Sequence, residues 1–81
     1  MTRTHAEEEA LSILARIGNV SQEELRPDLH LVRDLALDSP TTLDLLMTME
    51  EKLDMEISEI DAATFITVDD VLAFVRKNHS G

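Results

Sequence analysis

The sequence predicts an all-α fold, a small four-helix bundle of three main helices and one short helix with a long first loop. Apolar residues recur at helical spacing in three segments, whereas β-branched runs and alternating polar and apolar residues are nearly absent. The 81 residues are expected to form a single domain, 1–81. Only 2% of residues are aromatic, so we expect a small core built from aliphatic residues and methionine.

The first helix is expected to run from about Arg3 to Ile17. Glutamates at positions 7–9 occupy its first turns, where the helix dipole favours acids. Gly18 and Asn19 are a signal for its end. Its core face is predicted from residues at 3.6-residue spacing, which are Ala6, Ala10, Ile13, Leu14 and Ile17.

A long connection follows, from about Val20 to Leu37. Ser21 and Glu24 have the spacing of a capping box for a single turn, which Pro27 then ends. The connection is too apolar for a free linker, so we expect it to pack over the helices. The apolar residues on which this rests are Leu25, Leu29, Leu31, Val32, Leu35 and Leu37.

The second helix is expected from about Ser39 to Leu53, with Asp38 or Ser39 as its N-cap and Pro40 in its first turn. Steps of 100° per residue divide it into zones. The predicted core face consists of Leu45, Leu46, Met49 and Leu53. A second apolar stripe, Leu43 and Met47, lies beside it and is flanked by Asp44, Glu50 and Glu51.

Two further helices are predicted. A short one spans about Ser58 to Ala63, capped by Ser58 with Asp61 three residues on. The last spans about Val68 to Asn78, with Thr67 as its cap and acids in its first turn. Its core stripe is formed by Val68, Val71, Leu72 and Val75.

Charge and composition exclude several classes of function. The net charge is -10, and ten acids and one base lie between Asp38 and Asp70. This balance argues against binding to nucleic acid or anionic lipid and favours a partner with a basic surface. No apolar run is long enough for a membrane span, and no signal peptide is evident, so we expect a cytoplasmic monomer.

Chemistry by the chain's own side chains is also disfavoured. There is no Cys, which excludes a disulfide framework, a thiolate metal site and a thiol nucleophile. His5, His30 and His79 lie in unlike segments without ligand spacing, so no metal site is predicted. No phosphate-binding glycine loop or catalytic triad is indicated, and we expect no catalytic residues.

One candidate site remains, at Asp38, Ser39 and Pro40. A serine at a helix start is most simply a cap. This one follows the longest loop and opens the most acidic helix, where helical N–H groups would stabilise a phosphate on its Oγ. Likewise, the acidic surface of this helix is either a solvated face or a docking surface with apolar anchors and a charged rim.

The stretch Leu31–Ser39, LVRDLALDS, resembles the motif of the acyl carrier protein family: an apolar residue, Asp-Leu-Gly, an apolar residue and Asp-Ser-Leu. The resemblance continues through the acidic helix and on to Val75, without a gap. It implies an acyl-carrier-protein-like bundle whose serine carries a covalent 4′-phosphopantetheine. A cofactor thiol would then hold acyl groups as thioesters, in lipid or specialised acyl metabolism.

Carried over by position, the resemblance makes Ser39 the attachment site, and Asp38 the acid that helps a phosphopantetheinyl transferase place the serine and its metal. Acyl-processing enzymes with basic patches would dock on the acidic helix and the segment after it. The docking residues implied are Leu43, Asp44, Met47, Glu50, Glu51, Glu56 and Ile57, with Glu59 extending the acidic face. The candidates to line an acyl pocket, for which core packing is the simpler role, are Leu45, Leu46, Met49 and Phe65.

The sequence departs from the family motif at three positions. Ala36 replaces the glycine, which is expected to restrict that turn to ordinary backbone angles. Pro40 replaces the leucine after the serine and removes an N–H, so a phosphate on Ser39 is expected to rely on Thr41 and Thr42. Thr41 replaces a common acid. These changes suggest a specialised carrier with a dedicated partner.

Other interpretations stay open at this point. The cargo could be a fatty acyl, polyketide, aminoacyl or other group. An acidic helical docking module without a prosthetic group is the alternative from another class, with Ser39 as a cap only. A small enzyme or metal-dependent protein is the third.

Overall fold

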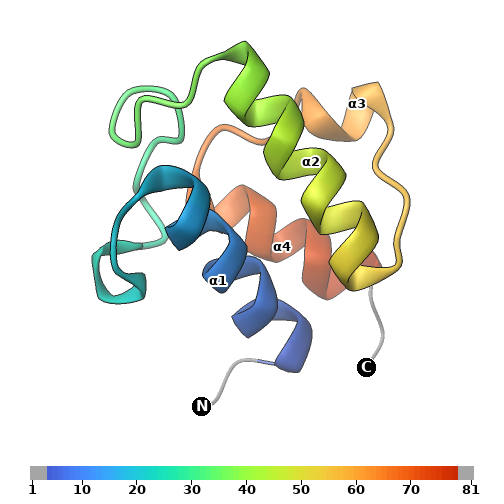
Figure 1. Cartoon of the computed structure of the whole chain (residues 1–81). Coiled ribbons are helices and arrows are strands. Elements are labelled where there is room, and N and C mark those ends of the chain that lie inside the picture. Colours follow the sequence, from blue (N-terminus) through green and yellow to red (C-terminus); the bar gives the residue numbers. More distant parts are fainter. Residues whose placement is uncertain (1–3, 79–81) are drawn as a thin grey trace.

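The computed structural model describes residues 4–78 and confirms the all-helical fold. Its elements are α1 (His5–Gly18), the 3-10 turn η1 (Gln22–Glu24), α2 (Ser39–Leu53), α3 (Glu59–Ala62) and α4 (Val68–Asn78). α1, α2 and α4 form the bundle, with the long connection before α2 on one side and α3 on the other (Figure 1). None of the helices within residues 4–78 is long and apolar enough to cross a membrane.

The first helix begins later than the sequence predicts. Thr4 is its N-cap: the Thr4 hydroxyl accepts the N–H of Glu7 at 3.1 Å, and the Glu7 carboxylate accepts the N–H of Thr4 at 3.0 Å. This reciprocal capping box fixes the start at His5, and Arg3 lies outside the described residues. At the other end Gly18 is the last helical residue, and Asn19 takes the left-handed conformation, with φ 57°.

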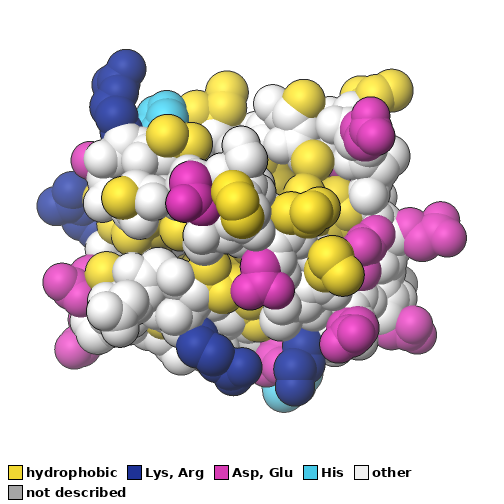
Figure 2. Space-filling model, turned by 45° about the horizontal axis from the view of Figure 1, so that its top comes forward, with side chains coloured by type: hydrophobic (Ala, Val, Ile, Leu, Met, Phe, Trp, Pro, Cys, Tyr) yellow, Lys and Arg dark blue, Asp and Glu magenta, His cyan; other side chains and the backbone are white. Residues whose placement is uncertain are grey.

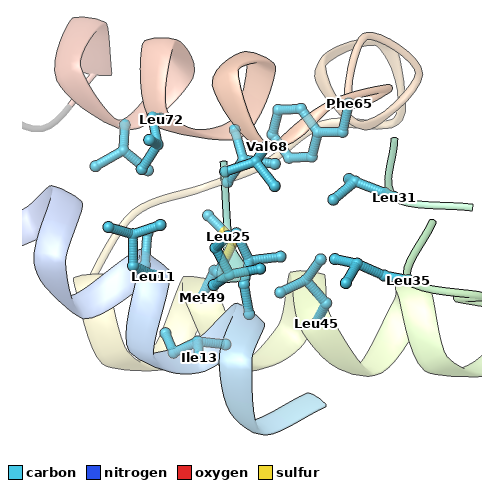
Figure 3. Close-up of a cluster of buried hydrophobic side chains, with 14 of the residues drawn as sticks. Leu11, Ile13, Leu25, Leu31, Leu35, Leu45, Met49, Phe65, Val68 and Leu72 are labelled. Atoms are coloured by element: carbon cyan, nitrogen blue, oxygen red, sulfur yellow. The ribbon is translucent and has the colours of Figure 1, made fainter. Parts of the chain in front are cut away.

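Buried side chains from the three long helices and the connection form the core (Figure 3). The predicted core stripes are confirmed except at Ile17 and Leu46, which are only half-buried. Leu11 is buried as well, which the predicted stripe of α1 missed. Phe65 and Phe74 meet edge to face, with ring centroids 5.2 Å apart.

The long connection packs down as predicted, although not at every residue. Leu25, Leu31, Leu35 and Leu37 are buried, but Val32 is 60% exposed. Backbone hydrogen bonds join the connection to the segment that opens α4. In these bonds, each 2.9 Å long, the N–H of Leu31 donates to the carbonyl of Ile66, that of Val68 to the carbonyl of Leu29, and that of Asp69 to the carbonyl of Pro27. The chain leading into α2 is therefore fixed against α4.

The last two helices follow the prediction closely. α3 is a single turn, one residue shorter at each end than expected, because Ser58 and Ala63 are its caps. α4 has the predicted bounds. At its start the Asp70 carboxylate accepts the N–H of Thr67 at 2.9 Å, while the Thr67 hydroxyl accepts the N–H of Asp70 at 3.3 Å. Thr67 thus acts as the predicted cap.

Candidate functional site

The start of α2 places Ser39 directly after an acidic cap. Asp38 is the N-cap, and its Oδ1 accepts the backbone N–H of Thr41 at 3.0 Å. Hydrogen bonds from Thr41, through its side chain and its backbone, lower the pKa of the Asp38 carboxyl below its ordinary value of 3.8. Ser39 is exposed and is the first residue of the helix. An accessible hydroxyl therefore lies next to a carboxylate that stays ionised at neutral pH.

The expected phosphate ligands are not available at this helix start. The N–H of Thr41 donates to the Asp38 carboxylate, and the N–H of Thr42 donates to the Asp38 carbonyl at 2.8 Å. Pro40 has no N–H to donate. In the unmodified chain Asp38 therefore already uses both of the donors that were expected to hold a phosphate on Ser39.

The turn before the site also differs from expectation. Ala36 has φ 56°, in the left-handed region, so the prediction of ordinary backbone angles is wrong. The reason lies in its neighbours: Leu35 and Leu37 are both buried, whereas Ala36 between them is exposed. Left-handed geometry at Ala36 lets both leucines reach the core. Leu37 then delivers the chain to Asp38 and Ser39.

Two hollows flank Ser39 and α2. A groove of about 630 Å³ is lined by Val32, Leu37, Asp38, Ser39, Thr42, Leu43 and Leu46. A smaller hollow of about 380 Å³ is lined by Pro40, Thr41, Leu43, Asp44 and Met47. Leu43 borders both hollows, and its side chain is 57% exposed, as is that of Met47. The second apolar stripe predicted from the sequence is thus at the surface.

Acidic side chains lie beside this apolar surface. Figure 2 shows hydrophobic side chains gathered on the upper face, with acidic side chains beside them and basic ones toward the edges of the view. Asp44, Glu51 and Glu56 are exposed. Glu50 is half-buried, and its Oε2 accepts the backbone N–H of Ile57 at 3.0 Å. Among the predicted docking acids, Glu50 therefore also holds the segment after α2 against the helix.

The four acyl-pocket candidates belong to one apolar cluster. Leu45 and Met49 are completely buried in the core, and Phe65 is buried in the same cluster, with 9% of its surface exposed. Leu46 is half-buried: it packs against this core and also lines the groove beside Ser39. The acyl-lining role of these residues stays a prediction, because they pack together without an enclosed space of their own being needed to explain their burial.

Sequence reasoning missed three exposed apolar residues. Val32 forms part of the groove, which no sequence pattern indicates, because a turn has no apolar periodicity. Ile60 is 81% exposed on α3, and Ile66 is 52% exposed before α4. Across residues 4–78, His, Asp and Glu side chains do not gather into groups of three or more that could hold a metal ion.

Comparison with known proteins assigns this arrangement to a family. The family model described as "Phosphopantetheine attachment site" matches residues 8–75. This span contains both hollows and the start of α2. An acyl carrier protein from Desulforapulum autotrophicum is 38% identical over 65 residues, covering 80% of this chain and 84% of that protein.

Solved structures share the fold. The solution structure of a candidate acyl carrier protein from Anaplasma phagocytophilum has a TM-score of 0.81 at 26% identity, covering 95% of this chain and 91% of that one. The acyl carrier protein from Enterococcus faecalis has a TM-score of 0.80 at 23% identity, covering 96% of this chain and 99% of that one. The second likeness shows the fold alone.

Proposed function

This chain belongs to the acyl carrier protein family, and we propose that it carries acyl groups on a 4′-phosphopantetheine arm attached to Ser39. The family bears this group covalently. When bound, the arm supplies a thiol that holds acyl groups as thioesters, and this chain has no Cys of its own for that purpose. The protein would act as a carrier and not as an enzyme.

The observation that carries the proposal is the exposed Ser39 hydroxyl beside Asp38 at the start of α2. The residues present fit the group. Ser39 is reachable from solvent, Asp38 is held ionised by Thr41, and a groove of about 630 Å³ opens next to the serine. Modification requires a phosphopantetheinyl transferase to bring coenzyme A, which donates the arm, and a metal ion to the Ser39 hydroxyl. Ser39 is exposed, so the described surface leaves this hydroxyl open to the transferase.

Partners are proposed to dock on the smaller hollow of α2. Leu43 and Met47 offer exposed apolar anchors, and Asp44, Glu51 and Glu56 supply negative charge nearby. Such a surface suits acyl-processing enzymes that present a basic patch with an apolar centre. Binding through exposed charges would weaken as salt rises, because charges are screened over about 8–10 Å at physiological ionic strength.

Pro40 supports a narrower proposal, that this is a specialised carrier. It lines the hollow on which partners would dock, next to Ser39, and so forms part of the surface that a transferase or synthase would contact. The cargo class is left open between fatty acyl, polyketide, aminoacyl and other acyl groups.

A second candidate function is a docking module without an arm. The observation that favours it is that the hollow with Leu43 and Met47 is formed by the unmodified chain. Under this alternative, Ser39→Ala would leave all partner binding and cellular activity unchanged.

The test is the intact mass of the purified chain before and after incubation with coenzyme A, Mg²⁺ and a broad-specificity transferase. Ser39→Ala is the critical variant. Ser58→Ala is the matched control, because Ser58 is another exposed serine at a helix start. We expect one phosphopantetheine to be added to the wild type and to Ser58→Ala, and none to Ser39→Ala. Addition to Ser39→Ala, or no addition with either a broad or a cognate transferase, would contradict the proposal.

A further inference from the structure

We propose that the groove beside Ser39 binds the pantoyl part of the arm, so that the arm runs along α2 between Leu46 and the turn that carries Val32. The inference rests on the proposed attachment at Ser39. The residues that would orient the arm line the two walls of the groove: Val32 and Leu37 on one wall, and Thr42, Leu43 and Leu46 on the other.

The groove begins at the attachment point and follows the helix. Ser39, Thr42 with Leu43, and Leu46 are successive positions along one side of α2, and all of them line the groove. At a rise of 1.5 Å per residue, the distance from Ser39 to Leu46 is about 10 Å along the helix axis. An extended chain advances about 1.2 Å per bond, so the groove matches about eight bonds of the arm.

Counting from the serine oxygen, eight bonds pass the phosphate, the dimethyl-substituted carbon and the hydroxyl-bearing carbon, and end just beyond the first amide. This is the pantoyl part. The thiol lies further along the arm and would extend past Leu46, where a partner enzyme could reach it.

The chemistry of the groove matches this order of groups. The N–H groups of Thr41 and Thr42 already donate to Asp38, so the phosphate stays in water at the open end. Beyond it, Val32 and Leu43 are 60% and 57% exposed, and this apolar area is available for the two methyl groups to cover. Thr42 is half-buried in the same wall as Leu43. Its hydroxyl is available to the polar atoms of the arm.

Val32 is held in position by its turn. The N–H of His30 donates to the Asp34 carboxylate at 2.7 Å, and the N–H of Arg33 donates to Nδ1 of His30 at 3.0 Å. These bonds hold the backbone of the turn on both sides of Val32, so the wall to which Val32 contributes is formed before any arm is attached. By contrast, Leu45 and Met49 are fully buried, and seating the arm among them would require the core to open.

The proposal can be tested by NMR on the modified protein without acyl cargo, with methyl labels on Ile, Val and Leu and an isotope-labelled arm. We expect nuclear Overhauser contacts from the pantoyl methyl groups to Val32 and Leu43, and from the protons just beyond the first amide to Leu46. In Val32→Ser the contacts to Leu46 should be lost, because one wall of the groove is gone. In Ile60→Ser they should persist, since Ile60 is equally apolar and 81% exposed but lies outside the groove.

Three results would overturn the proposal: contacts from the arm to Ile57 and Ile60 instead, contacts that survive Val32→Ser, or contacts that appear only after an acyl group is loaded. Mass spectrometry on the same samples separates this from failure of the proposed function. If Ser39 takes up no arm, the carrier assignment fails. If it takes up the arm and the contacts are absent, only the groove assignment fails.

Discussion

The Asp38 carboxylate accepts the backbone N–H of Thr41 at 3.0 Å, so the residue that precedes Ser39 is both the helix cap and a fixed negative charge. These two properties depend on each other. The hydrogen bonds that cap α2 are the ones that lower the pKa of Asp38. The geometry of the serine and the charge next to it should therefore respond together to pH.

Asp38→Asn tests this coupling, because Asn can still cap the helix but carries no charge. Since the pKa of Asp38 is lowered in the folded state, its ionised form stabilises the fold above the ordinary value of 3.8. That contribution is lost as pH falls below 3.8 through the lowered value. We expect the variant to melt at a lower temperature than the wild type at neutral pH, and the gap to close in acid. A gap of constant size across this range in thermal melts would contradict the coupling.

Ala36 should tolerate glycine and reject a β-branched residue. Its φ of 56° strains any side chain. Ala36→Gly removes about 1 kcal/mol of strain and adds about 0.5 kcal/mol of unfolded-state entropy, so a gain of about 0.5 kcal/mol is expected. Ala36→Val should destabilise by about 2 kcal/mol. The control is Ala63→Val, at an exposed alanine with φ -66°. Equal losses for both valine variants in urea unfolding would show that Ala36 is unstrained.

Glu50 and Glu51 should behave differently although they are neighbours with the same charge. Glu50→Ala removes the acceptor for the N–H of Ile57, and is expected to lower the free energy of unfolding by about 1 kcal/mol. Glu51→Ala changes an exposed residue and should have little effect on stability. Both variants should weaken partner docking. Chemical denaturation separates the two effects, and identical stabilities would remove the structural role of Glu50.

Arg76 and Glu7 join the two ends of the described chain. The Nε of Arg76 lies 3.5 Å from Oε2 of Glu7, whose side chain is 9% exposed while that of Arg76 is 53% exposed. Because solvent screens the exposed partner, Arg76→Met is expected to cost only about 1 kcal/mol. Lys77→Met is the matched control, with the same charge change on an exposed neighbour. If the two variants unfold at the same denaturant concentration, the ion pair contributes nothing.

The helices could be predicted from the sequence because their signals are local. Asp38 with Pro40, and Thr67 with the acids that follow it, predict the starts of α2 and α4, and the structure confirms both. Ser58 caps α3 as its spacing to Asp61 predicts, although the helix itself begins one residue later, at Glu59. The start of α1 was missed although Thr4 and Glu7 form the same kind of pattern. There the glutamate was interpreted only through the helix dipole.

The surroundings of Ser39 could not be predicted in the same way, because they depend on contacts distant in sequence. The left-handed angle of Ala36 follows from the burial of the leucines on both sides, which only the folded connection determines. The engagement of Thr41 and Thr42 is the exception, because it is local: once Asp38 is the N-cap, its carboxylate accepts the N–H three residues on and its carbonyl accepts the N–H four residues on. Val32 lines the groove because of the way the long connection folds, which its apolar pattern does not show.

Three backbone hydrogen bonds join residues 27–31 to residues 66–69, so the position of the chain that leads to Ser39 depends on a segment that lines neither hollow. A saturation screen scored by attachment of the arm would therefore show two kinds of sensitive position. Those around α2 report recognition by the transferase. Those near Ile66 and Thr67 report whether the serine is presented at all, and a transferase with a redesigned surface would rescue the first kind and leave the second unchanged.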